Sequence, residues 1–446
     1  MEKKIIRNVQ LVNEGKICTT DVLIHGERIE RIDPHINTAY AVDETDGSGK
    51  YLIPGMIDDQ VHFREPGLTH KGTIRQESRA AVAGGVTTFM EMPNTIPPAL
   101  TLDLLDDKYR IAARDAAANY SFYLGVSNQN ADIVLQANQL KKDICGIKIF
   151  MGSSTGNLLV DNFNTLEKIF SESELLITTH CEDETIIRRN TEQMVRSGKE
   201  PGPEDHPIIR DDEACYASSL RAVKMAQKYN TRLHILHITT EKELALFGNM
   251  APLRDKNITA EVCVHHLHFS SDDYDALGYK IKCNPAIKAP HNREALWKAL
   301  LDDRIDVIAT DHAPHLLSEK QAPYAQAHAG LPLVQHPLLI LLHHVKQGRI
   351  SLERLVEKTS HAVSDCYRIA DRGYIREGYF ADLVLIDLNA ETTVTSSNLH
   401  YTCGWSPFEG FTFPASIEKT WVSGHLAYDR GQLVVTQPGH RLSFIR

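Results

Sequence analysis

The stretch LIPGMIDDQVHFREPG, residues 52–67, carries the pattern that decides the fold of this chain. A short apolar run, typical of a buried strand, ends there in a cluster of polar side chains. Amphipathic helical segments separate it from seven similar runs, and together these runs cover residues 52–63, 86–93, 120–126, 146–152, 175–182, 231–239, 258–266 and 306–314. The alternation predicts βα units and a parallel sheet, which we expect to close into a (β/α)8 barrel; a long doubly wound sheet is the alternative.

The two ends of the chain differ from this central pattern. Residues 1–52 and 372–446 show short alternating strands that are broken by Gly, Asp and Asn turns. We expect these two segments to pair into one small β-sandwich domain, which leaves residues 53–371 for the barrel. At 446 residues, the chain is long enough for a large domain with a smaller one attached.

The composition is typical of a soluble globular protein that binds small molecules. The formal net charge is −10 and there is no block rich in Lys and Arg, so we expect no nucleic-acid partner. No apolar run is long enough to cross a bilayer and the first residues do not resemble a signal peptide, so we expect no membrane association and a cytoplasmic location. The eight cysteines are scattered, without a CxxC pair, and are expected to be reduced.

Polar residues gather at the C-terminal ends of the β-rich runs. In a barrel these ends meet at one mouth, where active sites lie, so we expect residues far apart in sequence to share one pocket. The candidates are His62 and Arg64, Asn94, Lys148, His180, His237, His265 or His266, Asp311 and His315.

Strand geometry predicts which of these side chains face the pocket. Residues i and i+2 of a strand point to the same side, so Gln60, His62 and Arg64 project together if the extended conformation continues to Arg64. The alternative is a buried, hydrogen-bonded His62 and a surface Arg64.

Two pairs of histidines need a choice. His234 and His237 lie three residues apart and should face opposite sides of a strand, so only one can point into the barrel, and we choose His237. His265 and His266 are adjacent and pose the same choice; we leave both outside the set of metal ligands.

Lys148 and Asp311 are candidates for metal binding and catalysis. Lys148 lies between Ile147 and Ile149; burial would lower its pKa, and the neutral amine can add carbon dioxide to form a carbamate that bridges two metals. A buried lysine paired with a carboxylate is the alternative, which spacing alone favours. In ATDHAPH, Asp311 can ligate a metal and move a proton, while a neutral His315 can hold a substrate oxygen.

Taken together, these motifs resemble the cyclic amidohydrolase branch of the amidohydrolase superfamily, and within it the longer, class I dihydroorotases. The resemblance extends over nearly the whole chain. It rests on PGMID, HFREPG, THKGT, AGGVTTFMEMPNT, GIKIFMGSS, THCE, LHILHIT, AEVCVHH, CNPAIK, ATDHAPH and EGYFADLVLID.

The resemblance implies a ligand and substrate set. The implied ligands of one or two zinc ions are His62, Lys148 as its carbamate, His180, His237 and Asp311, with the last ligand position falling on Gln60. The implied substrate contacts are Arg64 and Asn94, which hold a carboxylate, Asn284 and His315, and the backbone of His328, Ala329 and Gly330. Allantoinases typically replace the Arg of REPG, so Arg64 favours a dihydroorotase over a hydantoinase or allantoinase type of cyclic amidase.

The reaction that the resemblance implies is the reversible hydrolysis of (S)-dihydroorotate to N-carbamoyl-L-aspartate in de novo pyrimidine (UMP) synthesis. A hydroxide held by zinc attacks the ring carbonyl, and Asp311 passes a proton to the departing ring nitrogen. The family also implies a homodimer and an association with aspartate transcarbamoylase.

Gln60 is the departure from the family pattern. A neutral amide oxygen is a poorer zinc ligand than imidazole, and Asp58 is expected to support the strand end rather than to replace it. Three outcomes stay open: a binuclear site with one weakened metal, an enzyme with one metal, or an inactive homologue that serves as a structural partner. The other site residues are all present, which favours an active enzyme.

Overall fold

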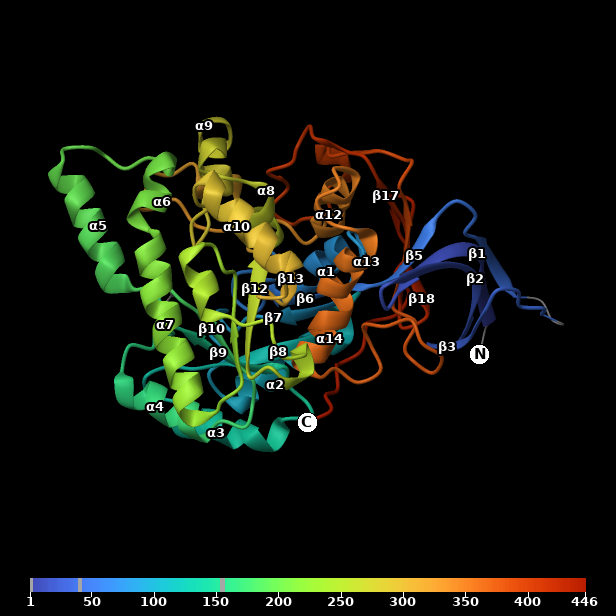
Figure 1. Cartoon of the computed structure of the whole chain (residues 1–446), viewed down its shortest axis with the longest axis horizontal. Coiled ribbons are helices and arrows are strands. Elements are labelled where there is room, and N and C mark those ends of the chain that lie inside the picture. The colour runs from blue at the N-terminus through green and yellow to red at the C-terminus, as the bar shows by residue number, and fades with distance from the viewer. Residues whose placement is uncertain (1–2, 39–41, 153–156) are drawn as a thin grey trace.

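The computed structural model describes residues 3–38, 42–152 and 157–446, and eight parallel strands in it form a barrel (Figure 1). The strands are β6 (Met56–Val61), β7 (Val86–Glu91), β8 (Asn119–Gly125), β9 (Gly146–Phe150), β10 (Ile177–His180), β11 (Leu233–Ile235), β12 (Ile258–Cys263) and β13 (Val307–Ala309). The barrel closes between β6 and β13: the His62 backbone N–H donates to the His312 carbonyl at 2.7 Å, and the Asp58 carboxylate accepts from the Thr310 N–H and hydroxyl. The predicted barrel is confirmed, and Asp58 supports its closure.

Helices surround the barrel and connect its strands (Figure 1). They are α1 (Ile74–Ala83), α2 (Leu102–Asp115), α3 (Ala131–Gln136), α4 (Phe163–Glu172), α5 (Glu184–Arg196), α6 (His206–Ile209), α7 (Asp212–Tyr229), α8 (Val264–His268), α9 (Tyr274–Leu277), α10 (Pro290–Leu301), α11 (Leu317–Lys320), α12 (Pro337–Lys346), α13 (Leu352–Val356) and α14 (Ala362–Tyr367). Capping residues fix the start of several helices. The side chains of Thr73, Thr101 and Asp211 accept hydrogen bonds from backbone N–H groups in the first turns of α1, α2 and α7. Within the described ranges, no helix has the length and apolarity needed to span a membrane.

Helix α14 and the end of the chain close the barrel at the end opposite to the strand C-termini. Tyr367 of α14 contacts Tyr123 of β8, and both side chains are fully buried. Leu442 and Phe444 belong to the same apolar cluster, and the backbone at Phe444 pairs with Ile369. The residues before and after residue 371 therefore share one core at this end of the molecule.

The two ends of the chain form one curled, largely antiparallel sheet beside the barrel (Figure 1). Its strands are β1 (Lys3–Asn13), β2 (Lys16–His25), β3 (Arg28–Asp33), β4 (Asp43–Asp46), β5 (Tyr51–Pro54), β14 (Leu383–Asp387), β17 (Ser416–Val422), β18 (His425–Asp429) and β19 (Gln432–Leu433); β15 (Thr392–Thr393) and β16 (Thr412–Phe413) pair separately. The N-terminal β5 lies between β1 and the C-terminal β14. The expected pairing of the two ends is confirmed, while the exact division at residues 52 and 371 stays a prediction.

The curl brings the turns of two distant hairpins into contact. Gly424, at the turn between β17 and β18, has a φ of 75°. A Cβ at this position would lie 2.1 Å from the carbonyl oxygen of Gly26, in the turn between β2 and β3. Only glycine allows both the left-handed backbone and this close approach.

A buried ion pair joins the sheet to the barrel. Arg372 and Asp382 are ion-paired and nearly inaccessible. The other oxygen of Asp382 accepts from the Asn119 side chain, at the start of β8, at 2.9 Å and from the Ser423 N–H at 2.8 Å. One carboxylate therefore connects a barrel strand to two parts of the C-terminal sheet.

We expect Asp382→Ala to lower the free energy of unfolding by about 3–5 kcal/mol, because it leaves the buried Arg372 guanidinium without a counter-charge. Asp33→Ala is the matched control, since Asp33 pairs with Arg31 at 2.7 Å on the surface and should matter little. Urea unfolding followed by circular dichroism measures both changes. Equal losses in the two variants would contradict this role for Asp382.

Candidate active site

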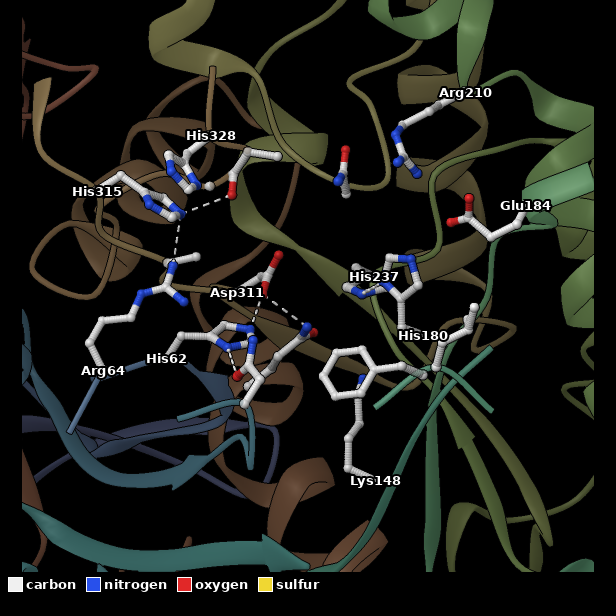
Figure 2. A pocket seen from close by; sticks show the side chains of 18 residues that line it. His62, Arg64, Lys148, His180, Glu184, Arg210, His237, Asp311, His315 and His328 are labelled. Carbon is white, nitrogen blue, oxygen red and sulfur yellow. Dashed lines mark hydrogen bonds and ion pairs between the residues drawn. The ribbon is translucent and has the colours of Figure 1, made fainter. Parts of the chain in front are cut away.

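A cavity of about 490 Å³ lies at the C-terminal ends of the barrel strands, and it gathers every predicted metal ligand and substrate contact (Figure 2). The predicted residues that line it are Gln60, His62, Arg64, Asn94, Lys148, His180, His237, Asn284, Asp311, His315, His328, Ala329 and Gly330. Phe150, Leu159, Glu184, Arg210 and Ala313 complete the wall. Ser153 and Ser154 of the GIKIFMGSS motif lie outside the described residues.

The segment after β6 reaches the pocket by a route that differs from the expected one. The strand ends at Val61, and Arg64 has a left-handed backbone with a φ of 70°, so the extended conformation does not continue to Arg64. The side chains of Gln60, His62 and Arg64 nevertheless share the pocket. Arg64 is only 7% exposed, so the alternative of a surface arginine is wrong.

His234 and His237 both point into the barrel, which corrects the expectation that only one would. His234 Nε2 lies 3.2 Å from an Asp59 oxygen of β6 and 3.7 Å from a Glu261 oxygen of β12. Because β6 and β11 are not neighbours, this contact must cross the interior. The i, i+2 rule fails because β11 ends at Ile235 and His237 has a φ of 39°. His237 lines the pocket, and His234 lies outside its lining.

Neither His265 nor His266 lines the pocket. Strand β12 ends at Cys263 and α8 begins at Val264, so strand alternation does not apply to these two histidines. Their rings pack together with centroids 4.0 Å apart, and His266 Nε2 lies 3.1 Å from the Pro285 carbonyl oxygen. The expectation that one of these two histidines lies in the pocket is therefore wrong. Their exclusion from the predicted metal ligands is consistent with where they lie.

Lys148 is buried in the pocket floor without the carboxylate partner that an ordinary buried lysine would have. In the part of the chain that the structure describes, its Nζ makes no hydrogen bond or ion pair, and it lies 4.7 Å from the centre of the Phe150 ring. Burial lowers the pKa of Lys148 to about 8. A substantial neutral fraction near physiological pH gives this amine the nucleophilic form that reacts with carbon dioxide.

His180 and His237 present two ring nitrogens to the same space. His180 Nδ1 and His237 Nε2 are 3.0 Å apart, close to the roughly 3.3 Å that separates two nitrogen ligands of a tetrahedral zinc ion. Burial and the charges of His180 and Lys148 hold the pKa of His237 well below its usual range, so its ring stays neutral, as a metal ligand must be. These donors fit a zinc ion.

Asp311 contacts two side chains from β6 and the residues directly after it. One of its oxygens accepts from Gln60 Nε2 at 3.0 Å and lies 3.0 Å from His62 Nε2. Gln60 thus presents its amide nitrogen to Asp311, while its oxygen lies 3.9 Å from Cys263 Sγ. An amide nitrogen is no metal ligand, so in this conformation Gln60 fits a metal less well than the other residues.

The opposite end of the pocket suits an anion. Figure 2 shows Arg64, His315 and His328 together on one side of Asp311. The guanidinium of Arg64 lies 3.0 Å from His315 Nε2 and donates to the Pro314 carbonyl at 3.1 Å. Burial lowers the pKa of Arg64 to about 10, so it stays charged at neutral pH. Asn94 links the two ends, because its side-chain oxygen lies 2.7 Å from His62 Nδ1.

A buried lysine holds the loop that closes this end. Lys320 Nζ donates to the carbonyls of Lys282, His328 and Gly330 at 2.8–2.9 Å, which uses all three N–H groups of an ammonium. Gly330 has a φ of 141°, and a Cβ there would lie 2.5 Å from the Ala313 carbonyl oxygen. The loop therefore presents its backbone to the pocket in a fixed position.

Arg210 and Glu184 are functional candidates that sequence reasoning missed (Figure 2). Arg210 follows the short helix α6, where no strand end or motif marks it. Its partner Glu182, which accepts from Arg210 at 2.6 Å, could have been found, because it ends the same THCE run as His180.

Comparisons with known proteins agree with this geometry. The model of the amidohydrolase family matches residues 51–427. A dihydroorotase of Halobacterium salinarum is 34% identical over 96% of both chains, and one of Staphylococcus epidermidis is 28% identical over 96% of this chain and 99% of its own. The solved structure of an L-hydantoinase (dihydropyrimidinase) from Arthrobacter aurescens has a TM-score of 0.93, with 26% identity over 99% of this chain and all of that one. Fold, pocket and relatives confirm the resemblance seen in the motifs: the chain belongs to the amidohydrolase family.

Proposed function

We propose that this protein is a dihydroorotase, which hydrolyses (S)-dihydroorotate reversibly to N-carbamoyl-L-aspartate in pyrimidine synthesis. The observation that carries the proposal is a buried, charged Arg64 in the same pocket as a group of metal-ligating side chains. A planar guanidinium is the natural partner of a carboxylate, and dihydroorotate carries a carboxylate on its ring. The relatives of similar length that are named dihydroorotase support the same substrate.

The proposed ligands of one or two zinc ions are His62, Lys148 as the carbamate formed with carbon dioxide, His180, His237 and Asp311, with Gln60 as a weak addition. Bound zinc would polarise the ring carbonyl. It would also lower the pKa of a water molecule, so that the water loses a proton more easily and becomes the nucleophile. The nearly unpaired Lys148 amine and the converging ring nitrogens of His180 and His237 support this assignment.

The protein's own residues then orient the ring and move a proton. Arg64 and Asn94 hold the substrate carboxylate, with His315 beside them. Asp311 lies between the two ends of the pocket, where it can take a proton from the attacking water and give it to the ring nitrogen that leaves (Figure 2). We assign the remaining ring contacts to Asn284 and to the backbone of His328, Ala329 and Gly330.

The alternatives are weaker. The relatives that match over nearly the whole chain carry enzyme names, which favours an active enzyme over an inactive structural homologue. A hydantoinase type of cyclic amidase is the second candidate, because one such structure superimposes with a TM-score of 0.93. Hydantoin lacks a ring carboxylate, so this reading leaves Arg64 without a ligand. A cytoplasmic location, a homodimer and association with aspartate transcarbamoylase are part of the proposal.

We expect Arg64→Met to lower kcat/KM for L-dihydroorotate by about 100-fold, because a charged hydrogen-bonding partner of the carboxylate is lost. Steady-state hydrolysis by zinc-loaded protein measures the change, and hydantoin is the control substrate, since it has no carboxylate to lose. Wild-type activity on hydantoin that exceeds activity on dihydroorotate would contradict the proposed substrate.

We expect Gln60→His to raise the affinity for the more weakly held of two zinc ions by at least tenfold, because imidazole is a better zinc ligand than an amide. Zinc counting after dialysis against buffers of fixed free zinc measures it. His62→Gln, the opposite substitution at the neighbouring ligand position, should lower the zinc occupancy. An unchanged zinc affinity in Gln60→His would show that position 60 is no ligand.

We expect zinc uptake by metal-free protein to depend on bicarbonate, because the proposed bridge forms from the Lys148 amine and carbon dioxide. Reconstitution with ¹³C-bicarbonate should give a carbamate carbon signal by NMR in the wild type and none in Lys148→Met. Lys288→Met, at another buried lysine, is the control that should keep the signal. Full zinc uptake without bicarbonate would exclude the carbamate.

A further inference from the structure

A buried carboxylate holds one of the proposed zinc ligands from behind. Glu182 lies two residues after His180 and is completely inaccessible. Its Oε2 lies 2.9 Å from His180 Nε2 and accepts from the Arg210 guanidinium at 2.6 Å. Its other oxygen makes no hydrogen bond within the described residues. A single oxygen therefore joins a ring nitrogen on one side to a fixed positive charge on the other.

The hydrogen bonds of Glu182 determine which nitrogen of His180 is free. The Arg210 guanidinium donates to Oε2 at 2.6 Å, and this buried ion pair keeps Glu182 as a carboxylate. An ionised carboxylate can only accept, so the Nε2–H of His180 must donate to it. In the neutral ring, Nδ1 then has the free lone pair, and Nδ1 is the nitrogen that faces His237.

Arg210 is itself held in place from two sides. Its backbone N–H donates to the His206 carbonyl at 2.9 Å. The Asn190 side chain, from helix α5, donates to the Ile209 carbonyl at 3.1 Å and to the Asp211 carboxylate at 2.9 Å. The guanidinium thus lies at the pocket wall on a segment with fixed flanks, close to His180 in Figure 2.

We propose that Glu182 and Arg210 are positioning residues that fix His180 in the tautomer and orientation required to bind zinc through Nδ1. Carboxylates that accept from the far nitrogen of a ligating histidine fix its ring and raise its basicity. Arg210 keeps that carboxylate in position by charge and by its rigid guanidinium. The inference deepens the proposed zinc chemistry and rests on it for the metal alone, not for the identity of the substrate.

Glu182→Gln tests the proposal with zinc binding as the primary readout. Gln has the same shape but no charge, and its amide can also donate, so His180 is no longer forced into one tautomer. We expect at least a tenfold loss of zinc affinity at the site of His180 and His237. A competing chelator measures the affinity, and the visible spectrum of cobalt-substituted protein reports the changed ligand geometry.

Two further variants separate positioning from general destabilisation. Glu243→Gln replaces another buried glutamate, which is bonded to Ser219 and Thr240 away from the pocket, and should leave zinc affinity unchanged. Arg210→Lys keeps the positive charge but loses the planar guanidinium with its several N–H donors. It should lower zinc affinity by less than Glu182→Gln does. If Glu182→Gln does not fold, Arg210→Lys decides, and an unchanged zinc affinity in that variant overturns the proposal.

The outcomes also distinguish this inference from the proposed substrate. A wild type that binds zinc tightly but does not hydrolyse dihydroorotate, with weak zinc binding in Glu182→Gln, would refute the substrate and leave the positioning role intact. Wild-type hydrolysis with equal zinc affinity in wild type and Glu182→Gln would refute the positioning role alone. A wild type that binds no zinc would overturn both.

Discussion

The closure of the barrel between β6 and β13 is the contact on which the site depends. These strands come from opposite ends of the barrel sequence, and His62 follows β6 as Asp311 follows β13. Asp58 holds them together, because its two oxygens accept from the Thr310 N–H at 3.1 Å and the Thr310 hydroxyl at 2.6 Å. Without this closure, the two side chains that meet at the centre of the pocket would lie on opposite edges of an open sheet.

Below the pocket, the barrel interior carries charge as well as apolar side chains. Burial alone would lower the pKa of His234, but Cys366 and the carboxylates of Asp59 and Glu261 raise it well above its usual range, so it stays protonated. Glu261 also accepts from the His237 backbone N–H at 2.9 Å. This ionic layer connects strands on different sides of the barrel and supports a proposed ligand from beneath.

The sequence predicts the barrel and the members of the pocket well, because alternating strands and helices place all strand C-termini at one mouth. It fails where the backbone leaves regular geometry. Strand alternation could not place His234 relative to His237, since β11 ends between them, and it did not apply to His265 in helix α8. Arg210 carries no sequence signal at all, because its role depends on Glu182, a residue in a different segment that only folding brings near it.

The sheet beside the barrel has a consequence for synthesis of the chain. Strand β5, residues 51–54, needs β14, residues 383–387, as its antiparallel neighbour, so more than three hundred residues must leave the ribosome before the two can pair. Until then the N-terminal strands expose an unpaired edge, which is open to association with other chains. Any folding of the barrel before residues 383–387 emerge therefore takes place beside an unfinished sheet.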